Sequence, residues 1–234
     1  FGLVFENMPV DSDKPDLESS IGRQMNPGHV LEAMWFLLNY LENVPGSEEK
    51  IKGILNIISN TLEFGWDKEF GGIYYFMDAL GKPHLELQHN MKLWWVHNEA
   101  CIATLLAYSI TGDEKYWKWF EKAHFYAFGH FADKEYGEWY GYLHKDGTVS
   151  HTQKGSMWKG PFHYPRMLMN MEMLFEHLEA LGYTFTNGNA WHHDDKLAPA
   201  ILFVQFKHRL DVDIRFTRTC LHLNVEVHCP YPFR

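Results

Sequence analysis

The chain has 234 residues, with 21 Lys and Arg against 30 Asp and Glu, which gives a formal net charge of −9 at pH 7. Hydrophobic residues make up 46% and charged residues 22%, a balance that excludes an intrinsically disordered protein. A net anion without a basic stripe does not suit a nucleic-acid backbone, and no apolar run approaches the roughly 20 residues of a membrane span. We therefore expect one or two globular domains with no nucleic-acid and no membrane partner.

Cysteine usage and the N-terminus give further expectations. Cys101, Cys220 and Cys229 are too few for a disulfide framework, which favours a reducing compartment and a cytoplasmic location. The first residues show no signal segment, and because the chain begins at Phe1 we expect a fragment of a longer protein. The 9 Trp, 12 Tyr, 17 Phe and 15 His residues indicate either a bulky helical core or a pocket for flat ligands, and composition alone favours the core.

The predicted elements follow an internal repeat. Apolar spacing predicts a helix over 30–41 and, after a Pro-Gly break and a cap at Ser47, a second helix over about 48–62. Glycines and alternating aromatic residues predict a hairpin within 65–88. Helices are predicted again over 95–110 and 114–130, followed by a hairpin over 136–152 and a third-cycle helix over 162–181. Segment 67–72 recurs at 133–138, and the offset between these two segments defines the repeat.

This order of helix, helix and hairpin predicts an all-α fold in which about two and a half helix pairs form part of an α/α toroid, or an open solenoid. We expect one domain over 1–182 and an atypical C-terminal tail over 183–234, either an unrelated extension or a mis-spliced end. A strand is predicted over 211–218. The spacings of the histidines and cysteines in the tail match no zinc pattern, so we predict no metal site among His192, His193, His208, Cys220, His222, His228 and Cys229.

Three histidines stand at similar points of the repeat. His163 lies one repeat after His97, and His97 lies nearly one repeat after His29. In a toroid the first helix of each pair lines the axis, so these side chains would lie at equivalent helix starts. A single histidine in such a place is more simply a cap or a core residue. Three in register favour a common cavity, and we predict that all three face it.

Further polar residues accompany these histidines at helical spacing. Glu32 follows His29 by three residues, which places both on one helix face, where a carboxylate can fix the imidazole tautomer or raise the basicity of the histidine. An ordinary helix ion pair has the same spacing. Glu99 lies one turn after Trp95, and the Trp94-Trp95 pair is either a core contact or the floor of a sugar site.

The most specific segment is 154–166, where glycines and a proline shape a loop and His163 opens a helix. Arg166 follows His163 by three residues, on the same helix face. A cation in this position lowers the pKa of the imidazole and can hold an oxyanion. The alternative is that the segment is only a loop-to-helix capping motif.

Three of these segments resemble the N-acylglucosamine 2-epimerases, also called renin-binding proteins: 22–33 around His29, 91–100 around Trp94, and 154–166 around His163. Segment 133–142 is similar as well, and the resemblance covers about residues 1–180. It implies an (α/α)6 barrel and the interconversion of N-acetylglucosamine and N-acetylmannosamine at C2.

The resemblance also implies roles for individual residues. The two histidines that exchange the C2 proton match His29 and His163, an active-site glutamate matches Glu99, the helix glutamate matches Glu32, and Trp95 borders the sugar. No cofactor and no metal are required, although ATP activates parts of the family. A homodimer in the full-length protein and a contact with renin are further implications.

Six units of about 66 residues would need about 400, so the chain accounts for roughly half of the implied barrel. The other half is N-terminal and carries, in the family, an essential arginine that no residue here matches. We therefore predict a truncated N-acylglucosamine 2-epimerase, either active or inactive as this chain. The alternatives are a non-catalytic form that binds a protein such as renin, and another sugar isomerase of the same superfamily.

Overall fold

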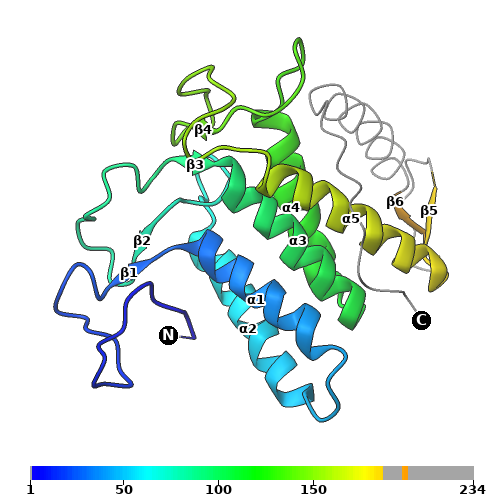
Figure 1. Cartoon of the computed structure of the whole chain (residues 1–234), viewed down its shortest axis with the longest axis horizontal. Helices are drawn as coiled ribbons and strands as arrows, with labels where there is room; N and C mark the ends of the chain where they lie inside the picture. The colour runs from blue at the N-terminus through cyan, green and yellow to red at the C-terminus, as the bar shows by residue number, and fades with distance from the viewer. Residues whose placement is uncertain (1, 187–196, 200–234) are drawn as a thin grey trace. The chain divides into compact units, whose positions relative to one another are not determined.

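The computed structural model describes residues 2–186 and 197–199, which fall in two compact units, Phe1–Gly182 and Tyr183–Arg234. The described part of the second unit holds β5 (Thr184–Thr186) and β6 (Leu197–Pro199), which pair in parallel. The strand predicted over 211–218 and the histidines and cysteines of the tail lie outside the described residues. The first unit is mostly helical, with α1 (Pro27–Leu41), α2 (Glu48–Gly65), α3 (Trp94–Thr111), α4 (Glu114–His130) and α5 (His163–Ala180) (Figure 1).

The predicted helices are confirmed, with ends that follow from local chemistry. Gly112 closes α3 in the left-handed region at φ 65°, and the side chain of Asp113 caps α4 by accepting the backbone N–H of Lys115. Ser47 stands at the predicted start of α2, but its side chain makes no capping hydrogen bond. Among the described residues, no helix combines the length and the apolar character needed to cross a membrane.

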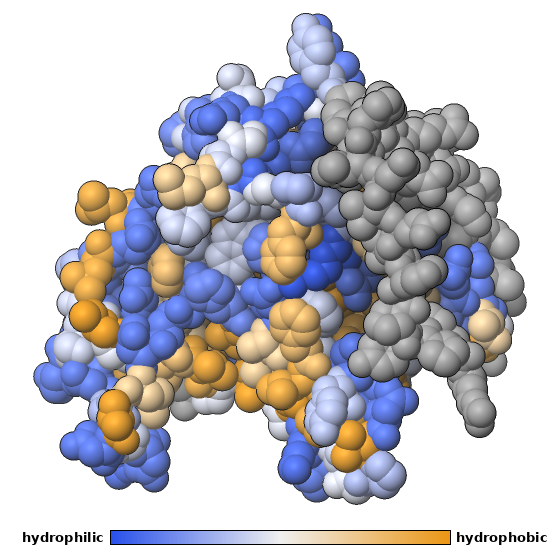
Figure 2. Space-filling model, viewed as in Figure 1, coloured by the Kyte–Doolittle hydropathy of each residue, from blue (hydrophilic) through white to orange (hydrophobic). Residues whose placement is uncertain are grey.

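The helices of the first unit form two layers. α1, α3 and α5 lie side by side with α3 in the middle, while α2 packs on α1 and α4 packs on α3 (Figure 1). Because α3 has neighbours on both sides and behind, its residues 94–108 are all buried. The two edge helices instead expose apolar side chains, Leu37 and Tyr40 on α1 and Met169 and Met173 on α5. Figure 2 shows hydrophobic residues interspersed with hydrophilic ones on the face drawn.

The predicted β-hairpin insertions are confirmed in part, as short local turns, while the named strands in these segments pair elsewhere. β2 (Met77–Asp78) pairs with β1 (Gln24–Met25), which precedes α1, and β4 (Tyr142–Leu143) pairs with β3 (Lys92–Leu93), which precedes α3. Local antiparallel pairing is short: Trp66 bridges to Ile73 and Leu143 to Val149, and two backbone hydrogen bonds flank each bridge. The alternating aromatic run fails as a hairpin signal because its backbone N–H groups at Tyr75 and Phe76 donate to the loop before α3 rather than to a neighbouring strand.

The sequence repeat corresponds to a repeated turn. Asp67 and Asp133 each accept, at Oδ1, the backbone N–H groups of the residues two and three positions further on. Each aspartate also binds a lysine, with Nζ to Oδ2 distances of 2.7 Å for Lys92 and 2.6 Å for Lys154. The sequence repeat is therefore a structural unit, and it connects the second helix of one pair to the first helix of the next.

Candidate active site

The first residues of α1, α3 and α5 bring His29, Trp95 and His163 together. The imidazole centroids lie 5.0 Å (His29) and 5.5 Å (His163) from the ring of Trp95. Both histidines keep contact with solvent, since their side chains are 54% and 19% exposed, whereas Trp95 is only 8% exposed. One nearly buried indole therefore contacts two accessible imidazoles that come from different helices.

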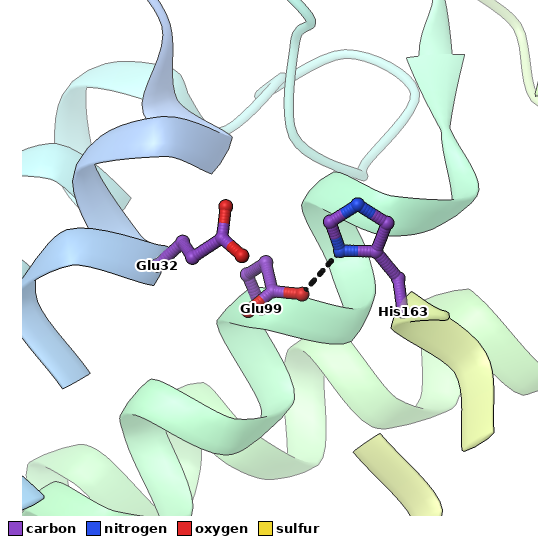
Figure 3. A group of neighbouring side chains, drawn as sticks. All are labelled: Glu32, Glu99 and His163. Carbon is purple, nitrogen blue, oxygen red and sulfur yellow. Dashed lines mark hydrogen bonds and ion pairs between the residues drawn. The ribbon is translucent and has the colours of Figure 1, made fainter. Parts of the chain in front are cut away.

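A buried carboxylate connects these helices. The Oε1 atom of Glu99 accepts a hydrogen bond from His163 Nδ1 at 2.7 Å (Figure 3). The same oxygen accepts from Arg166 Nη2 at 2.7 Å, and Oε2 accepts the indole N–H of Trp35 at 2.7 Å. Arg166 also forms an ion pair with Glu32 of α1. Because the Nδ1–H of His163 donates to Glu99, its Nε2 is the nitrogen left to exchange a proton.

His29 has a different carboxylate partner from the one that the sequence predicts. Its Nδ1 lies 3.0 Å from each carboxylate oxygen of Glu6, a residue of the segment before β1. The hydrogen bond to Glu6 raises the pKa of His29, burial opposes this rise, and the charges of Glu6 and Glu32 add to it. Of the two roles predicted for Glu32, fixing the tautomer of His29 is wrong, because Glu32 forms its ion pair with Arg166, whereas its charge does raise the pKa of His29.

His97 does not belong to this group. It lies two residues after Trp95, about 200° around α3, and is fully buried on the side of α4, stacked on Tyr126. Its Nδ1–H donates to the carbonyl of Leu93 at 2.8 Å and its Nε2 accepts the N–H of Ile73 at 3.0 Å. Burial lowers the pKa of His97 to about 3. The prediction that three histidines face one cavity is therefore wrong for His97, which is a neutral core residue.

Glu32, Glu99 and His163 also have the composition of a metal site, since one ligand atom from each lies within 4.8 Å of the others (Figure 3). Nη2 of Arg166, however, is within hydrogen-bond distance of all three groups. The guanidinium thus stands where a metal cation would have to bind. The cluster is an ion-pair network centred on an arginine, and the charge of that arginine is shared between two carboxylates rather than directed at His163 alone.

The structure adds residues to the site that the sequence does not indicate. Phe36 and Phe162 lie against the guanidinium of Arg166, with ring centroids 5.3 Å and 4.4 Å from Cζ. Tyr75 packs edge-on against Trp95 at 6.2 Å. Phe162 adjoins the histidine motif and could have been found there. Tyr75 lies in a loop without a helical period, so sequence spacing gives no signal for it.

The close approach of α1 to α3 requires glycine at position 28. A Cβ atom on Gly28 would lie 2.5 Å from Cζ3 of Trp95 and 2.9 Å from Cγ2 of Val96. We expect Gly28→Ala to lower the free energy of unfolding by about 1–3 kcal/mol, the usual effect of overpacking. Urea denaturation followed by tryptophan fluorescence measures this change.

The matched control is Gly53→Ala in α2, where an added Cβ would meet nothing within 4 Å. This substitution is expected to stabilise the chain by about 0.5–1 kcal/mol, because alanine is the better helix former. Equal stability of the two variants would show that α1 and Trp95 are not in the contact described.

Comparisons with known proteins identify the family. Residues 6–163 match the sequence profile of the N-acylglucosamine 2-epimerase (GlcNAc 2-epimerase) family. The chain is 44% identical over 172 residues to N-acylglucosamine 2-epimerase of Mus musculus and 44% identical over 175 residues to that of Bos taurus. These matches cover 74% and 75% of this chain but 41% of either relative.

A solved structure is similar as well. The cellobiose 2-epimerase of Bacillus thermoamylovorans matches with a TM-score of 0.54 and 26% identity, over 66% of this chain and 38% of that one. The chain thus spans about two fifths of the length of the curated relatives that it matches. Because the family profile covers most of the chain, including all of α1 to α4 and the start of α5, the chain belongs to the N-acylglucosamine 2-epimerase family.

Proposed function

We propose that this chain carries the proton-transfer site of an N-acylglucosamine 2-epimerase, which interconverts N-acetylglucosamine and N-acetylmannosamine. The observation that carries the proposal is the contact of two imidazoles, His29 and His163, with the same indole. Each imidazole has Nδ1 on a carboxylate and therefore presents Nε2 for proton exchange. Membership of the family supports the amino sugar as substrate.

The chemistry of the reaction matches this arrangement. A C–H next to a carbonyl is weakly acidic, so its removal needs a base that titrates near neutral pH and a positive environment for the oxyanion. A neutral imidazole takes the C2 proton of the open-chain sugar, the C–H electron pair forms the C1–C2 double bond, and the carbonyl oxygen becomes the oxyanion. The second imidazole, which is protonated, returns a proton to the opposite face of C2. Inversion therefore needs two histidines on different elements, as His29 and His163 are.

Positive charge is available for the oxyanion. Arg166 lies beside His163, and α1, α3 and α5 all begin at this site with the positive ends of their helix dipoles. Glu32 and Glu99 hold the guanidinium in place. In this proposal Arg166, Glu32 and Glu99 support the reaction, Trp95 borders the sugar, and the two histidines move the proton.

We further propose that the first unit is part of an (α/α)6 ring, with 1–182 as the epimerase domain and 183–234 as a tail outside it. The layer of α1, α3 and α5, backed by α2 and α4, supports this proposal. So do the exposed apolar side chains on the two edge helices, where further helix pairs would pack. In this proposal the proton exchange uses no metal and no redox cofactor. Activation by ATP, a homodimer of the full-length protein, renin binding and a cytoplasmic location are further predictions.

The test is deuterium incorporation at C2. The chain is incubated with N-acetylmannosamine in deuterium oxide, and the C2–H resonance is followed by NMR while the two sugars are separated by chromatography. Deuterium at C2 together with the appearance of N-acetylglucosamine supports the proposal. Absence of both from a chain whose circular dichroism is helical contradicts it and favours the non-catalytic binding form.

A second candidate is an epimerase of sugars without the N-acyl group, which is favoured by the structural similarity to a cellobiose 2-epimerase. The same assay with cellobiose separates the two candidates. Turnover of cellobiose but not of N-acetylmannosamine would assign the chain to the second class.

A further inference from the structure

We propose that Glu6 is a positioning residue for His29, which it holds through Nδ1 so that Nε2 points to the sugar. The role rests on the proposed function, since it concerns the acid-base group of that reaction. The geometry is specific, because both carboxylate oxygens of Glu6 lie 3.0 Å from His29 Nδ1. The partner comes from the segment that precedes β1 rather than from the next helical turn.

Glu6 is well anchored for this task. Its backbone N–H donates to the carbonyl of Gln24 at 2.9 Å, and Gln24 lies in β1, where it pairs with Asp78 of β2. Asp78 in turn forms a buried ion pair of 2.9 Å with Arg23. Glu6 is thus held by the β1–β2 pair, and β1 directly precedes α1. The orientation of the His29 ring is therefore set by a residue outside its own helix.

The two histidines have carboxylate partners that differ in charge balance. Glu99, which binds His163, is paired with the guanidinium of Arg166. Glu6 forms its ion pair with His29, and no lysine or arginine within residues 2–186 and 197–199 forms an ion pair with it. The full negative charge of Glu6 therefore acts on His29.

In the described part of the chain, the charges that act on His29 are those of Glu6 and Glu32, and the charge of Glu32 is balanced by Arg166. Removing the charge of Glu6 while keeping its shape should therefore change the titration of His29 more than any other substitution in its surroundings. It should also free the ring to adopt the other neutral tautomer, in which Nε2 carries the proton and cannot act as a base.

The test replaces Glu6 with glutamine in the 234-residue chain. Imidazole resonances are followed by NMR as a function of pH, and the signal of His29 is assigned from its loss in His29→Gln. We expect the titration midpoint of His29 to move to lower pH in Glu6→Gln and to stay closer to the wild-type value in Glu6→Asp, which keeps the charge. Glu18→Gln, an exposed glutamate of the same segment, is the matched control and should leave the midpoint unchanged.

Kinetics provide the second readout. In Glu6→Gln the C2 exchange rate should fall about tenfold with little change in KM, and the limb of the pH–rate profile that reports His29 should move to lower pH. A His29 midpoint in Glu6→Gln equal to that of the wild type would overturn the proposal. If the wild-type chain shows no exchange at all, the proposed function fails, but the titration still decides whether Glu6 controls His29.

Discussion

Replacing either His163 or His29 with asparagine is expected to lower the rate of interconversion between the two amino sugars by about 10²–10⁴-fold, the usual contribution of a general acid or base. Asparagine occupies a similar volume and can keep a hydrogen bond to Glu99 or Glu6, but it has no group that takes up or releases a proton near neutral pH. The measurement is the appearance of N-acetylglucosamine from N-acetylmannosamine, with purified variants whose circular dichroism matches that of the wild type.

The two variants are expected to differ in a second assay. If each histidine serves one face of C2, each substitution should abolish deuterium exchange mainly from one of the two sugars, while exchange from the other sugar continues. The matched control is His144→Asn, which changes an exposed histidine between α4 and α5 and should keep the wild-type rate. Near-wild-type interconversion in either active-site variant would show that the assignment of the proton carriers is wrong.

The helices were predictable because their signals are local. Apolar residues at helical spacing, a glycine with positive φ at 112 and an aspartate cap at 113 act within a few residues of the ends that they define. Motifs at helix starts singled out His29 and His163, which the structure places against the same indole. The prediction that His97 faces the common cavity failed for a geometric reason. One repeat of 66 residues after His29 is Trp95, not His97. His97 lies two residues further along the helix, where the side chain points to nearly the opposite side.

The remaining parts of the site depend on which elements pack together. Glu32 could not be paired with Arg166, nor Glu99 with Trp35, without knowing that α1 and α5 both lie against α3. The carboxylate that binds His29 comes from a segment with no periodic pattern. The pairing of β2 and β4 was missed for the same reason, since their partners β1 and β3 precede the first helix of the preceding helix pair.

A second large effect is expected at the buried ion pair of the first repeat turn. Lys92 and Asp67 have side chains that are 0% and 2% exposed, with Nζ 2.7 Å from Oδ2. Burial lowers the pKa of Lys92 to about 8, although Asp67 opposes this, and the ammonium also lies 3.7 Å from the ring centroid of Tyr74. Lys92→Met keeps the length of the side chain but leaves the carboxylate of Asp67 buried without a cation. We expect a loss of about 3–5 kcal/mol in the free energy of unfolding, measured by urea denaturation.

The second repeat provides the matched comparison for this loss. Lys154 binds Asp133 in the corresponding turn, but its side chain is 27% exposed, so water can replace the ammonium in Lys154→Met. That substitution should therefore destabilise by only about 1 kcal/mol. The same loss in both variants would mean that burial does not determine the strength of these pairs.

The effect of pH separates an unpaired charge from a simple packing defect. Burial raises the pKa of Asp67, but Lys92 and the turn hydrogen bonds outweigh burial and hold this pKa at about 2, below its ordinary value of 3.8. In the wild type this carboxylate stabilises the fold above its ordinary pKa, and the contribution is lost as pH falls toward 2. In Lys92→Met the carboxylate should take up a proton at higher pH, which removes the buried charge. The stability difference between the two proteins should therefore shrink as pH is lowered from neutral toward 4, whereas a difference caused by lost packing alone would stay constant.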